Sequence, residues 1–229
     1  MLVAGFPAGP PETNCWVLAP ADGEECVVID PGIGAERALD DVLERHRLKP
    51  VAVLLTHGHF DHTWAVMPVC GAKGVPAWIA PADREQLADP WTKVGIRPGT
   101  PLFGRLEWAE PDDVRLLTDG ETLTLAGMDI RVDAAPGHTA GSVAFTTDRG
   151  GRLEFFSGDL LFAGSIGRTD FPGSSAQQIF ESLARVCLPL PDDTVVRPGH
   201  GPETTIGRER ISNPFLLELG AGSPPTRGL

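Results

Sequence analysis

The chain of 229 residues contains no tyrosine, and aromatic residues make up only 7% of it. Cysteine is also scarce, and the four cysteines form no C-x-x-C pair, which excludes a zinc ribbon or a dithiol redox motif. We therefore expect four reduced thiols in or near the core. They are Cys15, Cys26, Cys70 and Cys187.

Long apolar runs are missing as well. No stretch approaches the length of about 18 residues that a membrane-spanning helix needs. The first residues, MLVAGFPAGPPETN, have neither a basic start nor an apolar run of signal-peptide length. We expect a cytoplasmic protein that does not bind membranes.

Basic residues are few, with 19 Lys and Arg against 31 Asp and Glu, which gives a net charge of -12. This charge repels nucleic acid at long range, so we expect no nucleic-acid partner. The apolar fraction of 41% and the charged fraction of 22% are ordinary for a compact protein. Length and the lack of a linker predict one domain over residues 1–229, and the oligomeric state stays open.

Hydrophobic periodicity predicts a mixed α/β chain. A strand and a helix are expected over 78–88, and the segment 89–118, rich in proline, glycine and charge, is expected to be a long surface excursion. The other predicted strands are 15–18, 26–29, 51–55, 121–125, 128–132, 142–146, 153–156 and 195–196. The other predicted helices are 36–47, 176–186 and 205–211.

Five of the six histidines fall in three short segments, at residues 57–62, 138 and 200, whereas His46 is expected on a helix surface. In an extended segment His57, His59 and Asp61 share one side, and His62 faces the other. A loop that curls into a helix, with Gly58 allowing the bend, would instead place His57 with His59 and Asp61 with His62.

This spacing predicts two metal sites, because one ion cannot easily take four ligands from such a short segment. Each site needs further ligands. His138 and His200 can supply them, and Asp159 can supply an anion between the two ions. All three residues follow apolar, strand-like runs at glycine-containing turns.

Imidazole and carboxylate ligands suit zinc, iron and manganese, and no thiolate is required. We expect two divalent ions, with zinc favoured and iron or manganese as alternatives. A metal lowers the pKa of its bound water, so hydrolysis can proceed without a serine or cysteine nucleophile. A purely structural metal site is the competing non-enzymatic interpretation.

The pattern His57-x-His59-x-Asp61-His62, followed in order by His138, Asp159 and His200, resembles that of the metallo-β-lactamase superfamily. The resemblance implies an α/β fold, a four-layer αβ/βα sandwich with mixed β-sheets. It also implies a dinuclear metal site at the edge between the two sheets.

Within that superfamily the chain is most similar to short bacterial glyoxalase II proteins, through residues 162–174 and 207–216. The resemblance implies hydrolysis of S-lactoylglutathione or a related thioester by a metal-bridging hydroxide, with Asp61 and Asp159 as catalytic residues. It implies that one metal is held by His57, His59 and His138, that the other is held by Asp61, His62 and His200, and that Asp159 bridges them.

Two features depart from the longer glyoxalase II enzymes, which use a helical C-terminal domain and tyrosines to grip glutathione. Only 29 residues follow His200 in this chain, and it has no tyrosine. Thioester hydrolysis is therefore expected, while the identity of the thiol stays open.

Two further residues are candidates for the site. The resemblance implies that Arg168 is near the substrate carboxylate, which a guanidinium binds through two hydrogen bonds, whereas an ion pair with Asp170 is its alternative role. Asp30 either orients a metal-bound histidine or shapes a turn.

A rival function comes from residues 167–171, which also resemble persulfide dioxygenases. That family would use a single iron held by His57, His138 and Asp159, a ligand set that suits Fe(II) and oxygen. A β-lactamase or an RNA-processing nuclease on the same fold is a weaker alternative, because a fold does not fix a function.

Overall fold

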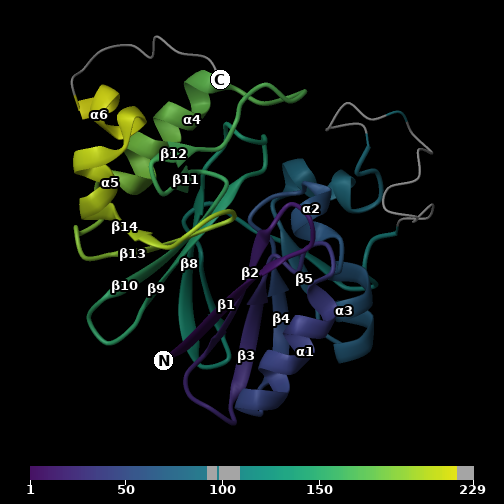
Figure 1. Cartoon of the computed structure of the whole chain (residues 1–229). Helices are drawn as coiled ribbons and strands as arrows, with labels where there is room; N and C mark the ends of the chain where they lie inside the picture. Colours follow the sequence, from purple (N-terminus) through teal and green to yellow (C-terminus); the bar gives the residue numbers. More distant parts are fainter. Residues whose placement is uncertain (92–96, 98–108, 221–229) are drawn as a thin grey trace.

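The computed structural model describes residues 1–91, Arg97 and residues 109–220. Two six-stranded sheets pack against each other, and helices cover both outer faces, which gives four layers (Figure 1). The expected α/β sandwich with two mixed sheets is confirmed. None of the helices in the described ranges is long and apolar enough to cross a membrane.

The first sheet comes from the N-terminal half and has the order β1-β2-β3-β4-β5-β6. Its first three strands pair antiparallel, and from β3 to β6 all pairs are parallel. The strands are β1 (Leu2–Ala8), β2 (Thr13–Ala19), β3 (Glu25–Ile29), β4 (Lys49–Leu54), β5 (Ala77–Ile79) and β6 (Val114–Leu116).

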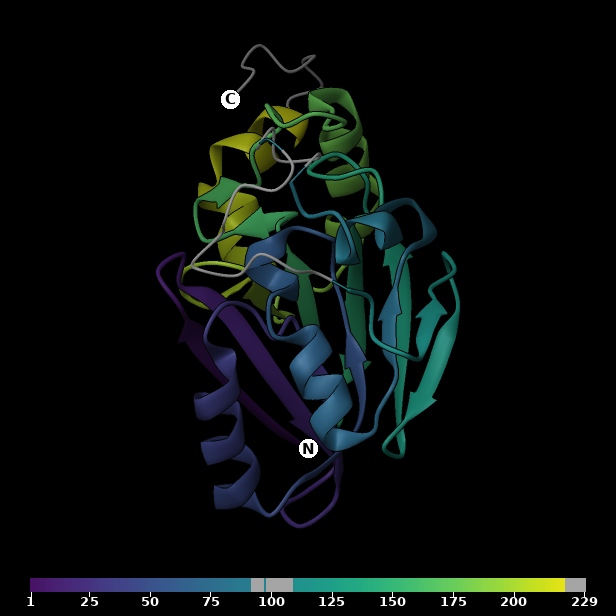
Figure 2. The ribbon, with the colours of Figure 1, turned by 90° about the vertical axis from the view of Figure 1, so that its right-hand side faces the viewer.

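Two helices, α1 (Ala35–His46) and α3 (Val66–Lys73), cover the outer face of the first sheet (Figure 2). The short helix α2 (Phe60–Thr63) and the 3₁₀ helix η1 (Pro81–Leu87) follow β4 and β5 at one end of the sheet. Pro68 is tolerated in α3 because it lies in the first turn, where backbone N–H groups have no partner within the helix.

The second sheet has the order β14-β13-β10-β9-β8-β7, in which only β10 and β13 pair in parallel. Its strands are β7 (Thr122–Leu125), β8 (Met128–Ala134), β9 (Val143–Asp148), β10 (Leu153–Gly158), β13 (Val195–Pro198) and β14 (Thr204–Thr205). A small hairpin pairs β11 (Leu161–Phe162) with β12 (Ser165–Ile166). Its outer helices are α4 (Ala176–Ser182), α5 (Ile206–Ser212) and α6 (Pro214–Gly220).

The alternation of side chains along the strands builds three separate core layers. In β2, for example, Cys15 and Val17 pack with the helices on the outer face of the first sheet, while Trp16 and Leu18 point between the two sheets. The middle layer also contains Phe145 and Phe156 of the second sheet. A third layer lies between the second sheet and α4 to α6. The four cysteines are free thiols in buried positions, in agreement with the sequence.

Strand direction places the candidate ligands at one edge of the sandwich. β8 and β10 are both antiparallel to β9, and β13 is parallel to β10, so the ends of β8, β10 and β13 meet at the same edge. His138, Asp159 and His200 follow these three ends, and His57 follows the end of β4 in the first sheet.

Most predicted elements exist, with shifted limits. The predicted helix 36–47 is α1, the helix 205–211 is α5, and the helix 176–186 is α4 followed by a π-helical turn at Leu183–Cys187. The predicted helix after the strand near Trp78 is the 3₁₀ helix η1. The expected excursion at 89–118 falls largely outside the described residues, although β6 lies within it.

Candidate metal centre

The loop after β4 carries four of the seven proposed ligands. His59 is the N-cap of α2 and has an extended backbone, with φ at −63° and ψ at 141°. The chain then turns into α2, which contains Asp61 and His62. The extended alternative, in which His62 faces away, is therefore wrong, and the curled alternative is the observed one.

Gly58 does not act as predicted, because its φ is not in the left-handed region. Gly58 instead allows the histidine loop to lie close to Asp83 and Gln86 of η1. A Cβ atom at this position would lie 2.6 Å from Gln86 Nε2 and 2.9 Å from the backbone oxygen of Asp83. The absence of a side chain lets the histidine loop pack directly on η1.

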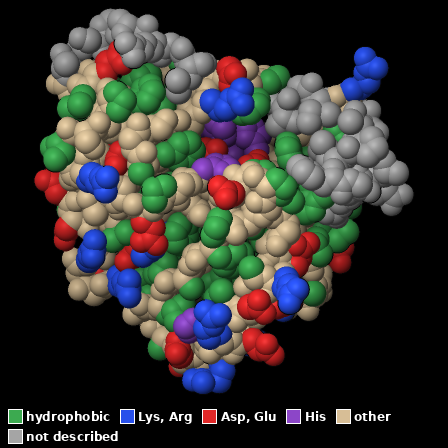
Figure 3. Space-filling model, viewed as in Figure 1, with side chains coloured by type: hydrophobic (Ala, Val, Ile, Leu, Met, Phe, Trp, Pro, Cys, Tyr) green, Lys and Arg blue, Asp and Glu red, His purple; other side chains and the backbone are tan. Residues whose placement is uncertain are grey.

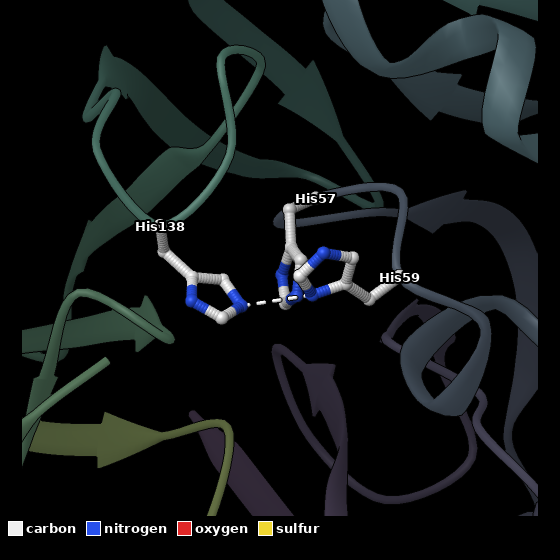
Figure 4. Close-up of side chains that lie close together, drawn as sticks. All are labelled: His57, His59 and His138. Atoms are coloured by element: carbon white, nitrogen blue, oxygen red, sulfur yellow. Dashed lines mark hydrogen bonds between the residues drawn. The ribbon is translucent and has the colours of Figure 1, made fainter. Parts of the chain in front are cut away.

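His57, His59 and His138 form the first group, and their ligand atoms lie within 4.8 Å of one another. The three rings point toward one another from two separate loops (Figure 4). His138 Nε2 lies 2.9 Å from His59 Nδ1. All three side chains are buried, with exposed fractions of 5% or less.

Asp61, His62 and His200 form the second group, within the same limit of 4.8 Å. His62 Nε2 lies 3.2 Å from His200 Nε2, and His200 Nε2 lies 3.3 Å from Asp61 Oδ2. His200 is brought to this place by β2, because Thr13 forms an isolated antiparallel bridge with it. The two halves of the chain therefore both contribute to the second group.

Asp159 lies between the two groups. Its Oδ2 atom is 3.4 Å from His138 Nε2 and 3.7 Å from His200 Nε2, while its Oδ1 atom is 3.4 Å from His62 Nε2. Asp159 also forms a third possible ligand group with His57 and His62. The structure thus brings all seven sequence-predicted residues together, and His46 lies apart from them, 3.0 Å from Asp22.

In four of the clustered histidines the Nδ1 atom faces an oxygen atom. His62 Nδ1 lies 2.9 Å from Asp30 Oδ2, and His57 Nδ1 lies 3.1 Å from Thr56 Oγ1. His138 Nδ1 and His200 Nδ1 face the carbonyl oxygens of Arg168 at 2.8 Å and Pro11 at 3.1 Å. A carbonyl can only accept, so these Nδ1 atoms carry the proton and Nε2 is left to bind a metal.

Asp30 lies at a turn and also contacts a histidine of the cluster. Its φ of 50° places it in the left-handed region at the turn after β3. Its buried carboxylate accepts hydrogen bonds from the Thr56 backbone N–H at 2.8 Å and the Thr56 hydroxyl at 2.5 Å, besides contacting His62. It therefore holds the start of the histidine loop and the ring of His62 at once.

The electrostatics of the site favour the protonation states that bind metal. Burial, assisted by His138, lowers the pKa of His59 to about 3, and burial lowers the pKa of His57 well below its usual value. Burial alone would raise the pKa of Asp159, but His62 and His138 outweigh it and hold that pKa well below the usual range.

His62 and His200 are the exceptions. Burial would lower the pKa of both imidazoles, but carboxylates outweigh burial: Asp159 and Asp61 raise the pKa of His62 well above its usual value, and Asp61 and Asp159 raise that of His200. In the metal-free cluster the carboxylates therefore favour the protonated form of these two imidazoles. A metal ion bound there would take the place of such a proton.

The residues fit a pair of metal ions. Within the described residues, His57 Nε2 is buried and has no hydrogen-bond partner, which is costly for a ring nitrogen in the interior. The facing nitrogens of His59 and His138 would repel each other through their lone pairs unless a proton or a cation lay between them. Imidazole and carboxylate donors suit zinc, iron and manganese alike, so the donor set does not select among them.

Arg168 makes the ion pair that the sequence analysis gave as its alternative role. Its Nε and Nη2 atoms donate to the two carboxylate oxygens of Asp170 at 2.7 Å and 2.6 Å. The guanidinium also lies 4.4 Å from the ring centroid of Phe171, and that ring is 5.0 Å from the ring of His59. Arg168 is thus an exposed cation beside the first ligand group.

Histidine side chains of the cluster are visible in a hollow on one face of the molecule, with acidic side chains beside them (Figure 3). His200 and Asp61 are its more exposed members, with side-chain exposures of 27% and 18%. The centre is therefore reachable from solvent mainly at the second group.

Sequence reasoning missed three supporting residues. The hydroxyl of Thr13 donates to Asp61 Oδ2 at 3.1 Å, Thr56 links Asp30 to His57, and Asp83 accepts a hydrogen bond from Gly58 N. Thr56 could have been suspected from its place next to the histidine motif. Thr13 and Asp83 lie far from it in sequence and carry no local signal.

Known proteins match this chain over nearly its whole length. The model of the metallo-beta-lactamase superfamily matches residues 8–200. An uncharacterized protein of Mycobacterium tuberculosis is 44% identical over 222 residues, which cover 96% of this chain and 99% of that protein. Hydroxyacylglutathione hydrolase GloC of Haemophilus influenzae is 37% identical over 205 residues, covering 90% of this chain and 93% of GloC.

Solved structures agree with this relationship. BLEG-1 B3 metallo-beta-lactamase is 40% identical to this chain and superposes with a TM-score of 0.82. The match covers 94% of this chain and 99% of the BLEG-1 chain. TTHA1623 in a di-iron-bound form is 38% identical with a TM-score of 0.76, covering 94% of this chain and 100% of its own. ETHE1 from Myxococcus xanthus shares the fold, with a TM-score of 0.73 and 24% sequence identity. The match covers 99% of this chain and 93% of the ETHE1 chain.

Proposed function

The chain belongs to the metallo-beta-lactamase superfamily as a metal-dependent hydrolase, and on this premise we propose that it cleaves thioesters, S-lactoylglutathione or a close relative of it. The observation that carries the proposal is the pair of three-residue ligand groups with Asp159 between them. We propose that His57, His59 and His138 hold one ion, that Asp61, His62 and His200 hold the other, and that Asp159 contacts both.

When bound, two divalent ions supply an activated water as nucleophile and a positive charge that stabilises the oxyanion of the attacked carbonyl. The contribution of the protein is orientation. The oxygens of Asp30, Thr56, Pro11 and Arg168 fix the histidine tautomers. Phe171 packs edge-on against the ring of His59, with the ring centroids 5.0 Å apart.

Arg168 is the proposed anchor for a carboxylate of the substrate. Its ion pair with Asp170 is exposed, with side-chain exposures of 59% and 46%, so a substrate anion can compete for the guanidinium. The position of its side chain beside Phe171 supports this role. The proposal includes a small-molecule thioester as partner and no nucleic acid.

The relatives support a thioester more than other substrates. GloC is named as a hydroxyacylglutathione hydrolase and matches over 93% of its own length. The likeness to BLEG-1 raises the opening of a β-lactam ring as a second hydrolysis to be assayed. The persulfide dioxygenase alternative would use only His57, His138 and Asp159 and would leave the second ligand group without a metal.

The test is a set of three assays on protein loaded separately with zinc, iron or manganese. We expect hydrolysis of S-lactoylglutathione, or of a lactoyl thioester of a smaller thiol, without consumption of oxygen. Comparison of the two thioesters decides whether glutathione is the thiol. Oxygen uptake with glutathione persulfide, or β-lactam opening that exceeds thioester hydrolysis, would overturn the proposal.

Asp159→Ala is the matching variant, and we expect it to have a lower metal content and no measurable turnover. His46→Ala is its control, because His46 lies outside the cluster and its Nδ1 atom lies 3.0 Å from Asp22 Oδ1. Full activity with intact metal binding in Asp159→Ala would refute the ligand assignment.

A further inference from the structure

Asp83 is a buried carboxylate that lies beside the metal centre but is not one of its proposed ligands. It belongs to η1, in the first half of the chain, and only 2% of its surface is exposed. A buried carboxylate is costly unless it is fully hydrogen-bonded. The groups that satisfy it therefore indicate what it holds in place.

Three donors from two loops converge on this carboxylate. Its Oδ2 atom accepts from the backbone N–H of Gly58 at 2.9 Å and from the Thr139 hydroxyl at 2.6 Å. Its Oδ1 atom accepts from the backbone N–H of Gly141 at 2.9 Å. A Cβ atom on Gly141 would lie 2.7 Å from Oδ1, so glycine is needed for this approach.

The two loops are those that carry the first ligand group. Gly58 lies between His57 and His59 in the loop after β4, and Thr139 follows His138 in the loop between β8 and β9. His59 and His138 come from different sheets, yet their facing nitrogens are only 2.9 Å apart. The carboxylate of Asp83 accepts hydrogen bonds from both loops at this point.

We propose that Asp83 is a positioning residue that sets the separation of His59 and His138, and thereby the metal affinity of the first ligand group. This inference rests on the ligand set given under the proposed function. Asp83 acts through Gly58 and through the loop of His138.

The effect should be confined to the first group, because the second group has its own supports. Asp61 accepts a hydrogen bond from Thr13, His62 contacts Asp30, and His200 contacts the carbonyl of Pro11. None of these three contacts involves Asp83. A substitution at Asp83 should therefore change the metal affinity of the first ligand group and leave that of the second unchanged.

The test variant is Asp83→Asn, which keeps the size of the side chain. The amide offers one acceptor oxygen, and its NH₂ group would face an N–H or hydroxyl donor. We expect the first group to bind metal about 10- to 100-fold more weakly, the usual effect of losing a residue that orients ligands. Asp41→Asn, on the exposed face of α1, controls for the loss of one negative charge.

The measurement is a titration of the metal-free full chain with Co²⁺, followed by visible absorption. His138→Ala and His200→Ala identify which part of the signal belongs to the first and which to the second group. The melting temperature of each metal-free variant is recorded alongside, because it reports general damage to the fold.

The proposal is supported if Asp83→Asn weakens the binding of only one Co²⁺ ion, the ion whose signal His138→Ala removes. The melting temperature of Asp83→Asn should then be near that of the parent. Unchanged binding of both equivalents, or equal weakening of both with a lowered melting temperature, overturns it. If His138→Ala itself binds two equivalents like the parent, the ligand set fails, and this inference fails with it.

Thr139 provides an independent variant if Asp83→Asn does not fold. Thr139→Val removes one donor to Asp83 and keeps the side-chain shape, so it should weaken the same equivalent by a smaller factor. Thr139→Ser retains the hydroxyl and should restore parent affinity. Equal affinities for Thr139→Val and Thr139→Ser would overturn the proposal.

Discussion

At the scale of single residues, the metal centre depends on which nitrogen of each imidazole faces inward. Four of the five clustered histidines have Nδ1 against an oxygen atom, and Asp30 provides the only carboxylate among these four contacts in the described chain. His59 is different, since its Nδ1 faces His138. The four rings that face an oxygen atom are thereby oriented without a metal.

Gly199 gives a prediction at this scale. A Cβ atom there would lie 2.2 Å from Asp159 Oδ1 and 2.7 Å from His62 Cε1, distances that no relaxed structure can keep. Gly199→Ala should therefore displace Asp159 and reduce both bound metal and thioester turnover, the latter by about 100-fold, which is typical of a misplacement near 1 Å.

Metal analysis and turnover of Gly199→Ala should be compared with those of Gly71→Ala. Position 71 lies in α3, where an added Cβ meets nothing within 4 Å, so this control should behave like the parent. Normal metal content in Gly199→Ala would show that the close approach is not required.

Arg168 and Asp170 give an opposite pair of effects. Arg168→Ala should raise the KM for a carboxylate-bearing thioester by roughly tenfold, because a charged hydrogen-bonded anchor is lost. Asp170→Asn should lower that KM, because it removes the anion that occupies the guanidinium in the structure. The kcat should change little in both. If both variants raise KM alike, the ion pair is structural and Arg168 is not the anchor.

At the scale of elements, the parallel pair β10 and β13 places Asp159 and His200 side by side. A buried ion pair links these strands. Arg197 Nε in β13 donates to Glu154 Oε2 in β10 at 2.7 Å, and the two side chains are 7% and 1% exposed. Arg197 also lies over the ring of Trp16 in the first sheet, 5.0 Å from its centroid.

Arg197→Met should lower the free energy of unfolding by about 3–5 kcal/mol, because it leaves the buried Glu154 without its main partner. Lys73→Met is the control. It breaks an exposed pair with Asp40 and should cost less than about 1 kcal/mol. Denaturant titration of the metal-free proteins measures both changes. Equal values for the two variants would contradict the role given to the buried pair.

Much of the fold follows from sequence patterns at this same scale. The helix α1 and the central strands β3, β4, β8 and β10 have clear periodicity or apolar runs, and their limits were predicted within a few residues. The edge strand β1 was missed because Gly5 and Pro7 interrupt it, which an edge strand tolerates. The helices α3 and α6 were missed because each contains a proline in its first turn.

The candidate site was predictable for a different reason. Histidine and carboxylate side chains are common metal ligands, so five histidines in three short segments stand out in the sequence. The supporting residues do not stand out. Thr13 and Asp83 are common residue types whose role comes only from the tertiary contacts that bring β2 and η1 to the ligand loops.

At the scale of the whole molecule, the centre joins the two halves of the sandwich. The first and second ligand groups each combine residues that follow β4 with a histidine from the second half of the chain. A metal ion bound there would therefore stabilise the packing of the two sheets as well as the site. Binding to the native state alone adds about 3–4 kcal/mol at a free concentration 100 to 1,000 times Kd.

Removal of metal with a chelator should accordingly lower the melting temperature by several degrees, as such a change in free energy requires for a chain of this size. Scanning calorimetry with and without EDTA, followed by addition of zinc, measures the effect. We expect zinc to restore the original value. An unchanged melting temperature with proven loss of metal would contradict the role of the centre in joining the sheets.

The central claim, a dinuclear thioester hydrolase, is tested most directly by activity as a function of metal content. Metal-free protein is loaded with zinc in steps from zero to two equivalents, and hydrolysis of S-lactoylglutathione is measured at each step. The account predicts that full activity needs the second equivalent and that no oxygen is consumed. Full activity at one equivalent, or oxygen uptake with glutathione persulfide by protein holding a single iron, would contradict it.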